Sequence, residues 1–495
     1  MIRSHTNSLL GDIEKLLISG ENSRARHLLK STNIRTIERA DLGFFCSLCR
    51  RLGYPQTSIK LLNPIVRATG KKQNKPSAEE ISEYAAALTY IGATEEASQL
   101  LLTVNAQDYP QSMLFQAFSL FAMWDYGSSL KPLTQFINTQ TISEYQKTIG
   151  QVNLAAALVY ERKCVEASKL ISSLLDKTKR ENQLLLHGNL WEIAAQNELF
   201  QRNWGSAKAC LKSSKDILSK HLSTGHLYVD KWQIILCAME NKSSHSRNQL
   251  KGFKLLARQQ SQWEVVRDCD RYEAIIFEDQ DLLNQVCIGT PYPKFIETTL
   301  KLFGPGYLLP NVFHRHLLDG SKARELDLLQ GKIVGSKLAL KTGLALHRLM
   351  LSLNSDFYRP LRIAVLHHHI FPNEFYNPLT SPKRVHEKIR LLRRWFVKAK
   401  VPLKITQEHR FYSLKASQPM RIKITVPKLN LPPLPVTLLR LKELLPNTFS
   451  SSEVARTLDI SPRSALRLVS LGLKTQALEA FGQGRNTSYR WLKQS

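Results

Sequence analysis

A turn pattern that recurs along the first half of the chain constrains its fold most strongly. A turn residue is followed five positions later by a small residue and nine positions later by an apolar one. The intervals between successive turn residues are 33, 39, 33, 37 and 40. The small residue lets two antiparallel helices approach closely, and the apolar residue four positions later lies on the same helical face. Each repeat therefore predicts one helical hairpin. The pattern is clearest at Gly20, Ala25 and Leu29, at Gly53, Ser58 and Leu62, and at Gly92, Thr94, Ala97 and Leu101, and weaker at Asp125, Leu130 and Thr134, at Arg162, Ala167 and Ile171, and at Arg202, Trp204, Ala207 and Leu211.

These segments resemble tetratricopeptide repeats across residues 7–218, most clearly at residues 84–102 and 201–211. They depart from the family in lacking the proline that ends its repeat and in having no strict period. The resemblance implies a solenoid over residues 1–220, because one hairpin cannot bury its apolar face alone, and a surface that binds a protein or peptide. The residues themselves leave open an irregular helical domain without a ligand groove. Residues 221–329 are expected to add further helical hairpins that cap the solenoid.

Positive charge is concentrated in the last third of the sequence. From Gln330 onward there are 29 Lys and Arg against 8 Asp and Glu, compared with 40 against 33 before that point. Most of the net charge of +28 therefore lies in this region. A surface of this kind attracts a polyanion, because each cation that neutralises a phosphate releases a counterion. Hydrophobic residues make up 43% of the chain, which argues against wholesale disorder and predicts folded basic domains.

Residues 330–417 carry the element order of one folded domain. We expect helices at 342–353, 359–369 and 381–398, then strands at 402–406 and 410–414 joined by a turn at 407–409. This order resembles the winged-helix output domain of two-component response regulators, with RVHEKIRLLRR at 384–394 and Phe411-Tyr-Ser-Leu414 closing the hairpin. The resemblance implies that the third helix binds duplex DNA. No phospho-accepting receiver domain accompanies it, so control by phosphorylation is not implied.

The third helix is amphipathic at 100° per residue. Its outward face carries several cations and one anion, and this suits the major groove, where Arg can pair with guanine. The alternative, a solvated helix on a scaffold protein, would carry charges of mixed sign. The apolar face is formed by Val385, Ile389, Leu392 and Phe396, the opposite face by Lys383, Glu387, Arg390 and Arg394, and the flanks by His386 and Arg393 on one side and Arg384 and Lys388 on the other.

Residues 418–434 are rich in proline and lysine and are predicted to be an extended linker. In residues 435–495 we expect a helix at 438–445, a capping box at 450–453 that opens a second helix, a third helix at 463–472 and a hairpin. Gly482-Gln-Gly-Arg485 followed by Tyr489 resembles the wing of the small winged helix-turn-helix of bacterial regulators. That resemblance implies DNA contacts by the wing and by Arg463 and Arg467, opposite the inward Ala465, Val469 and Gly472. Small winged helices also dock proteins, and this alternative stays open.

The predicted fold is thus mainly α, with an α-solenoid of helical hairpins followed by two winged-helix domains. The predicted function is that of a cytoplasmic, nucleoid-associated bacterial transcriptional regulator, whose repeats bind a protein or peptide and whose basic third binds double-stranded DNA. The alternative is a repeat-based scaffold that binds RNA or DNA without sequence preference. The predicted DNA-binding residues are Lys383, Arg384, His386, Glu387, Arg390, Arg393, Arg394, His409, Arg410, Arg463, Arg467, Gln483, Arg485 and Asn486.

No residue pattern demands catalysis, a cofactor or a metal, and we do not expect an enzyme. Cys46 and Cys49 form a CxxC within an apolar helical stretch and are read as buried thiols, because no second ligand pair accompanies them. His367-His-His369 is not expected to bind a metal, because adjacent helical residues point 100° apart. The first residues lack a signal-peptide core, and no uncharged apolar run approaches the ~20 residues of a membrane span.

Overall fold

The computed structural model describes residues 2–68, 75–221, 226–304, 306–318, 320, 323–372, 374–426, 438, 441–442, 444–458, 460–474, 477–482 and 487–492. The chain forms two compact units, which are described separately. Unit 1 comprises Met1–Leu283, Tyr292–Pro305 and Phe375–Ser381, and unit 2 comprises Asn284–Pro291, Gly306–Glu374 and Pro382–Ser495. Among the described residues, no helix combines the length and apolar character that crossing a membrane requires.

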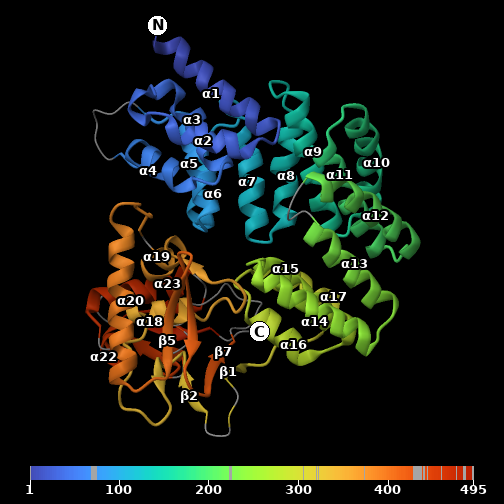
Figure 1. Ribbon diagram of the computed structural model, residues 1–495. Coiled ribbons are helices and arrows are strands. Elements are labelled where there is room, and N and C mark those ends of the chain that lie inside the picture. Colours follow the sequence, from blue (N-terminus) through green and yellow to red (C-terminus); the bar gives the residue numbers. More distant parts are fainter. Residues whose placement is uncertain are drawn as a thin grey trace. The chain divides into compact units, whose positions relative to one another are not determined.

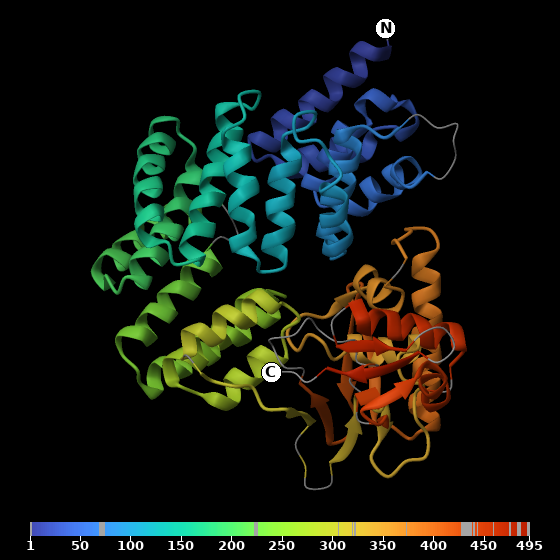
Figure 2. The same cartoon turned by 180° about the vertical axis from the view of Figure 1, so that it is seen from behind.

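Unit 1 is built from helical repeats, in which consecutive helices pair as antiparallel hairpins and neighbouring hairpins pack side by side (Figures 1 and 2). Its helices are α1 (Ile2–Ile18), α2 (Asn22–Ser31), the short η1 (Ile34–Thr36), α3 (Arg39–Arg51), α4 (Pro55–Val66), α5 (Ala78–Tyr90), α6 (Thr94–Leu101), α7 (Gln111–Ala122), α8 (Tyr126–Ile137), α9 (Glu144–Tyr160), α10 (Cys164–Arg180), α11 (Leu184–Phe200), α12 (Trp204–His221), α13 (His226–Glu240), α14 (Ser244–Gln259), α15 (Trp263–Phe277), α16 (Gln280–Ile288) and α17 (Pro293–Phe303). The helical repeats predicted for residues 1–220 are confirmed by this arrangement.

A left-handed residue follows the first helix in each of the six hairpins from α1–α2 to α11–α12 and sets the repeat. Gly20, Gly53 and Gly92 have φ of 83°, 90° and 90°, a conformation that glycine adopts without steric cost. Five residues after these turns, Ala25, Ser58 and Ala97 are buried, as expected for close helix contact. Arg162 and Arg202 adopt the same conformation ahead of buried Ala167 and Ala207, which confirms two of the weaker repeats.

The fourth repeat was predicted one residue too late. The left-handed residue is Trp124, with φ of 59°, and the buried positions are Ser129 and Leu133 instead of Leu130 and Thr134. Asp125 is instead the N-cap of α8, where its side chain accepts a hydrogen bond of 3.1 Å from the backbone N–H of Ser128. A tryptophan gives no sequence signal for a left-handed turn, whereas an aspartate does.

Unit 2 contains a four-stranded sheet that the sequence analysis did not predict. The strands are β1 (Val312–Leu318), β2 (Arg324–Asp327), β3 (Lys332–Ile333) and β7 (Met420–Thr425), in the order β1-β7-β2-β3. The strand β7 pairs antiparallel with β1 and parallel with β2. The helical prediction for residues 221–329 is therefore wrong beyond Phe303.

The linker prediction for residues 418–434 is also wrong in its first part. Met420 and Ile422 are fully buried in the core beneath the sheet, so β7 is a central strand. Arg421 and Lys423 point the other way and pair with Glu325 at 2.7 Å and with Asp327 at 3.0 Å. The period-two alternation was present in the sequence, but the surrounding prolines favoured an extended linker. Residues 427–437 lie outside the described residues.

Three helices and a second sheet follow in unit 2 over residues 345–416. The helices are α18 (Ala345–Ser352), α19 (Ile363–Ile370) and α20 (Ser381–Lys398), and the strands are β4 (Leu361–Arg362), β5 (Leu403–Glu408) and β6 (Phe411–Ala416), in the order β4-β6-β5. We call this the α20 module. It shares one apolar core with the four-stranded sheet. All three expected helices and both expected strands are present, with bounds shifted by a few residues.

The last segment, residues 448–491, is the α23 module. Its elements are β8 (Thr448–Ser450), α22 (Ser451–Leu458), α23 (Pro462–Lys474), β9 (Leu478–Phe481) and β10 (Ser488–Trp491), and the sheet order is β8-β10-β9. The predicted capping box is present, because the Glu453 N–H donates to Ser450 Oγ at 3.3 Å and the Ser450 N–H donates to Glu453 Oε2 at 2.7 Å. Phe449, Tyr489 and Trp491 complete a core with Leu438 and Leu441. Of the expected first helix, residues 439, 440 and 443 lie outside the described residues.

Candidate nucleic-acid interface

The helix α20 buries one stripe and exposes the opposite face, as its sequence predicts. Val385, Ile389, Leu392 and Phe396 are at most 3% exposed. Lys383, Arg390 and Arg394 are exposed on the other side, and Glu387 is half-buried. The apolar stripe fixes the rotation of the helix, because turning it would bring charged groups into the core. The basic face is therefore held outward.

Two of the predicted DNA-binding arginines on α20 are already paired with carboxylates. Arg384 forms a bidentate ion pair with Glu374 and lies over the ring of Phe371, with the guanidinium carbon 4.1 Å from the ring centroid. Arg390 pairs with Glu387 one turn earlier on the helix at 2.7 Å. The hydrogen bonds to these carboxylates raise the pKa of both arginines. A phosphate that binds either arginine must first compete with its carboxylate.

His386 and Arg393 fasten α20 to the hairpin of β5 and β6. The Nε2 atom of His386 lies 2.9 Å from the Tyr412 hydroxyl, and Arg393 donates from Nη2 to the Ile405 carbonyl at 2.8 Å. Their predicted position on the flank of the basic face is correct, and that flank is where the hairpin packs. Both residues therefore position the helix. Lys383 and Arg394 form no hydrogen bond or ion pair with any other described residue.

The hairpin turn of the α20 module is tighter than predicted. Glu408 pairs with Phe411 in the strand register, so the loop consists of His409 and Arg410 alone. These residues have φ of 48° and 69°, which is the pattern of a two-residue turn with both central residues left-handed. Both side chains are exposed at the tip of the hairpin. The expected turn at residues 407–409 is corrected by this register.

In the α23 module the predicted inward and outward faces are both observed. Ala465 and Val469 are buried, and a Cβ added to Gly472 would lie 2.5 Å from Leu478 Cδ1, so that position faces the core closely. Arg463 and Arg467 are exposed on the opposite face. Neither forms a hydrogen bond or ion pair with another described residue, in contrast to Arg384 and Arg390. The predicted wing residues Gln483, Arg485 and Asn486 lie outside the described residues.

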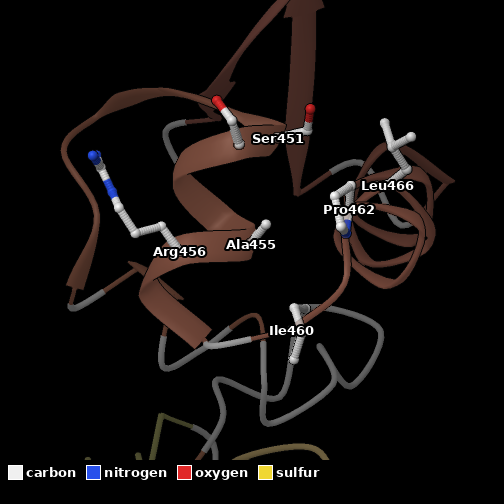
Figure 3. Close-up of a pocket in the computed structure, with 7 residues that line it drawn as sticks. Ser451, Ala455, Arg456, Ile460, Pro462 and Leu466 are labelled. Atoms are coloured by element: carbon white, nitrogen blue, oxygen red, sulfur yellow. The ribbon is translucent and has the colours of Figure 1, made fainter.

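A hollow of about 420 Å³ lies at the elbow between α22 and α23. Figure 3 shows Leu466 and Pro462 on one side of it and Arg456 on the other, with Ala455 between them. The sequence analysis did not single out Leu466 or Arg456. The available signal was a leucine on the flank of an amphipathic helix, next to two arginines of its outward face. The hollow is lined by Ser451, Ser452, Ala455, Arg456, Ile460, Pro462 and Leu466.

Within unit 1, later helices cover the turn ends of the central hairpins. Trp124 donates from its indole N–H to Glu264 of α15 at 3.1 Å, and its ring packs edge-on against Phe295 of α17 at a centroid distance of 4.7 Å. The Tyr160 hydroxyl lies 3.2 Å from Thr298 Oγ1 and accepts from buried Arg271 at 3.3 Å. These hairpin ends are therefore packed against later helices of unit 1.

Cys46, Cys49 and His367 are buried, whereas His368 and His369 are partly exposed. Burial raises the pKa of the Cys46 thiol, and it raises that of Cys49 to about 12. His367 is 1% exposed, and burial followed by the charge of Arg384 lowers its pKa to about 4. No group of three or more His, Cys, Asp or Glu suited to a metal ion occurs among the described residues.

No protein-family model matches the sequence, and no curated protein matches it. Among solved structures, the chain is similar to the crystal structure of a Rap protein complexed with competence and sporulation factor. The sequence identity is 11% and the TM-score is 0.37, over 61% of this chain and 85% of that chain. The helical repeats of unit 1 are established by the geometry of its own hairpins.

Proposed function

We propose that the chain is a DNA-binding transcriptional regulator, in which the α20 and α23 modules are winged helices and the helical repeats bind a protein or peptide. The observation that carries this proposal is the same construction at two places in the basic third. In each module a long helix buries an apolar stripe, turns arginines outward and is followed by a β-hairpin. A helix of this kind fits the major groove, and a hairpin beside it reaches the neighbouring backbone or minor groove.

The charge distribution supports a polyanionic partner for these modules. The basic third carries 29 cationic against 8 anionic residues, and several of its outward cations have no carboxylate partner among the described residues. Two readers on one chain would also raise affinity for a double site through effective concentration. In this proposal the chain is not an enzyme and needs no cofactor.

The test is binding of the full chain to duplex DNA in competition with unrelated duplex. A sequence-specific regulator keeps a specificity ratio above ~10³. The double variant Arg390→Ala with Arg394→Ala removes two phosphate or base contacts and is expected to weaken specific binding at least tenfold. The matched control is Lys169→Ala with Lys212→Ala, two exposed lysines on the helical repeats, which should bind like the wild type. Undiminished binding by the α20 variant would remove that helix from the interface.

The carboxylate pairing on α20 favours one alternative, a repeat-based scaffold with nonspecific nucleic-acid binding. Arg384 and Arg390 already have partners, which leaves fewer free cations on α20 for reading bases. A scaffold would bind through phosphates alone, so its affinity for the specific and unrelated duplexes would be equal. The same competition assay therefore distinguishes the two functions.

A further inference from the structure

A half-exposed leucine lies beside the basic face of α23. Leu466 is 52% exposed and lies on the flank of the helix, between the buried face of Ala465 and Val469 and the exposed face of Arg463 and Arg467. Half of a large apolar side chain therefore stays in contact with solvent next to two exposed arginines. A leucine there is suited to contact with an apolar group on a partner that also attracts arginine.

The charges around Leu466 point to a polyanion as that partner. Arg463 and Arg467 of α23 form no hydrogen bond or ion pair with another described residue, and Arg456 of α22 interacts electrostatically with Glu453 one turn earlier. Carboxylates already hold Arg384 and Arg390 of α20. A phosphate backbone therefore meets less competition at α23 than at α20.

The hollow beside Leu466 has the chemistry to receive a methyl group. Its apolar lining is formed by Ala455, Ile460, Pro462 and Leu466, while Ser451 and Ser452 contribute hydroxyl groups and Arg456 lies on the other side (Figure 3). In the major groove of B-DNA, thymine is the base that presents a methyl group, on C5, and apolar side chains read it by direct contact. Arginines at the two sides can bond the adjacent phosphates or a guanine.

We propose that α23 is the main sequence-reading helix of the chain and that Leu466 reads the C5-methyl group of a thymine in duplex DNA. The inference rests on the proposed DNA-binding function and adds to it the base feature that is recognised. It also ranks the two modules, because within the described part of the α23 module no carboxylate pairs with Arg463 or Arg467 beside the apolar reader. An apolar side chain of a partner protein would fit the same hollow, and the experiment separates the two occupants.

The experiment begins with selection of bound sequences from a pool of random 30-base-pair duplexes by the full chain. The best duplex is then made with deoxyuridine in place of each thymidine in turn, which removes one methyl group and leaves the pairing edge intact. At one position the wild type should lose about fourfold in affinity, the effect of one buried methyl group. The Leu466→Ala variant should bind the thymine and uracil duplexes equally.

The control variant is Val397→Ala, which shortens an apolar side chain that is 80% exposed on α20. It should keep the fourfold preference for thymine. If a sequence is selected but Leu466→Ala still prefers thymine, the proposed reader is wrong while DNA binding stands. The reader is equally wrong if the wild type shows no methyl dependence at any position, which would fit a protein occupant of the hollow. If no sequence is enriched, the proposed function itself fails, and the inference fails with it.

Discussion

The buried ion pair between Arg50 of α3 and Glu83 of α5 gives the sharpest test of how the repeats are held together. Arg50 donates from Nε and Nη2 to the two carboxylate oxygens of Glu83 at 2.8 and 3.0 Å. The two side chains are only 8% and 1% exposed. The Tyr109 hydroxyl also donates to Glu83, at 3.3 Å, so this carboxylate joins α3 and α5 to the loop that precedes α7.

Replacing Glu83 by glutamine keeps the shape and removes the charge. Burial lowers the pKa of Arg50, and the charge and hydrogen bonds of Glu83 more than offset this, so the net pKa is raised. Glu83→Gln removes that rise, but a guanidinium stays protonated at neutral pH because its ordinary pKa is far above 7. An unpartnered buried charge costs about 3–5 kcal/mol, and we expect about 3 kcal/mol because the glutamine oxygen still accepts one hydrogen bond. Glu14→Gln is the matched control, because its ion pair with Arg51 is solvent-exposed and should contribute less than about 1 kcal/mol.

The assay is hydrogen exchange of the backbone amides of α3 and α5 across a urea series. It reports the free energy of local unfolding, which in a repeat array depends mainly on neighbouring repeats. The double variant Arg50→Met with Glu83→Leu should lose less stability than Glu83→Gln, because it buries no lone charge. A loss for Glu83→Gln no larger than that of Glu14→Gln would refute the reasoning.

Two further predictions concern glycine substitutions and the pH dependence of stability. Gly289→Ala should lower the free energy of unfolding by about 1–3 kcal/mol, because the added Cβ would lie 2.5 Å from Phe357 Cγ. Gly252→Ala should raise it by up to ~1 kcal/mol, because open space surrounds this position in α14, and thermal unfolding measures both effects. The pKa of His367 is lowered to about 4, so the unfolded chain binds more protons between that value and its ordinary 6.5. The free energy of unfolding should therefore fall as the pH drops from 6.5 toward 4, and it should fall less steeply in His367→Leu. Urea unfolding at each pH measures this, and equal pH slopes for the wild type and the variant would contradict the prediction.

Local patterns in the sequence predicted local structure well. The left-handed conformation of the turn glycines Gly20, Gly53 and Gly92 was predictable from the sequence, because few other residues adopt it without steric cost. The buried face of α20 was also predictable, because helical periodicity alone defines the apolar stripe. Trp124 did not reveal its turn, because packing against Phe295 and Tyr126 stabilises a conformation that tryptophan does not favour by itself.

The pairing of strands and side chains that lie far apart in the sequence could not be predicted. The strand β7 pairs with β1 and β2, which lie about a hundred residues earlier, and nothing near residue 420 indicates those partners. The partner of Arg384 was hidden similarly, because Glu374 lies ten residues away across a loop whose path periodicity does not define. Residue type predicted which side chains face outward, but not which of them form an ion pair with a carboxylate.

The difference between paired and free arginines has a consequence for how the two modules would share a DNA site. A phosphate that approaches Arg384 must replace the bidentate Glu374, so part of its attraction is offset by the lost pair. Among the described residues, no carboxylate pairs with Arg463 or Arg467, so a phosphate that approaches them would displace none of these. In the proposed function, binding through α23 would therefore begin with the larger electrostatic gain. The tether between the modules would then raise the local concentration of DNA at α20, and the exchange of Glu374 for phosphate would become an intramolecular step.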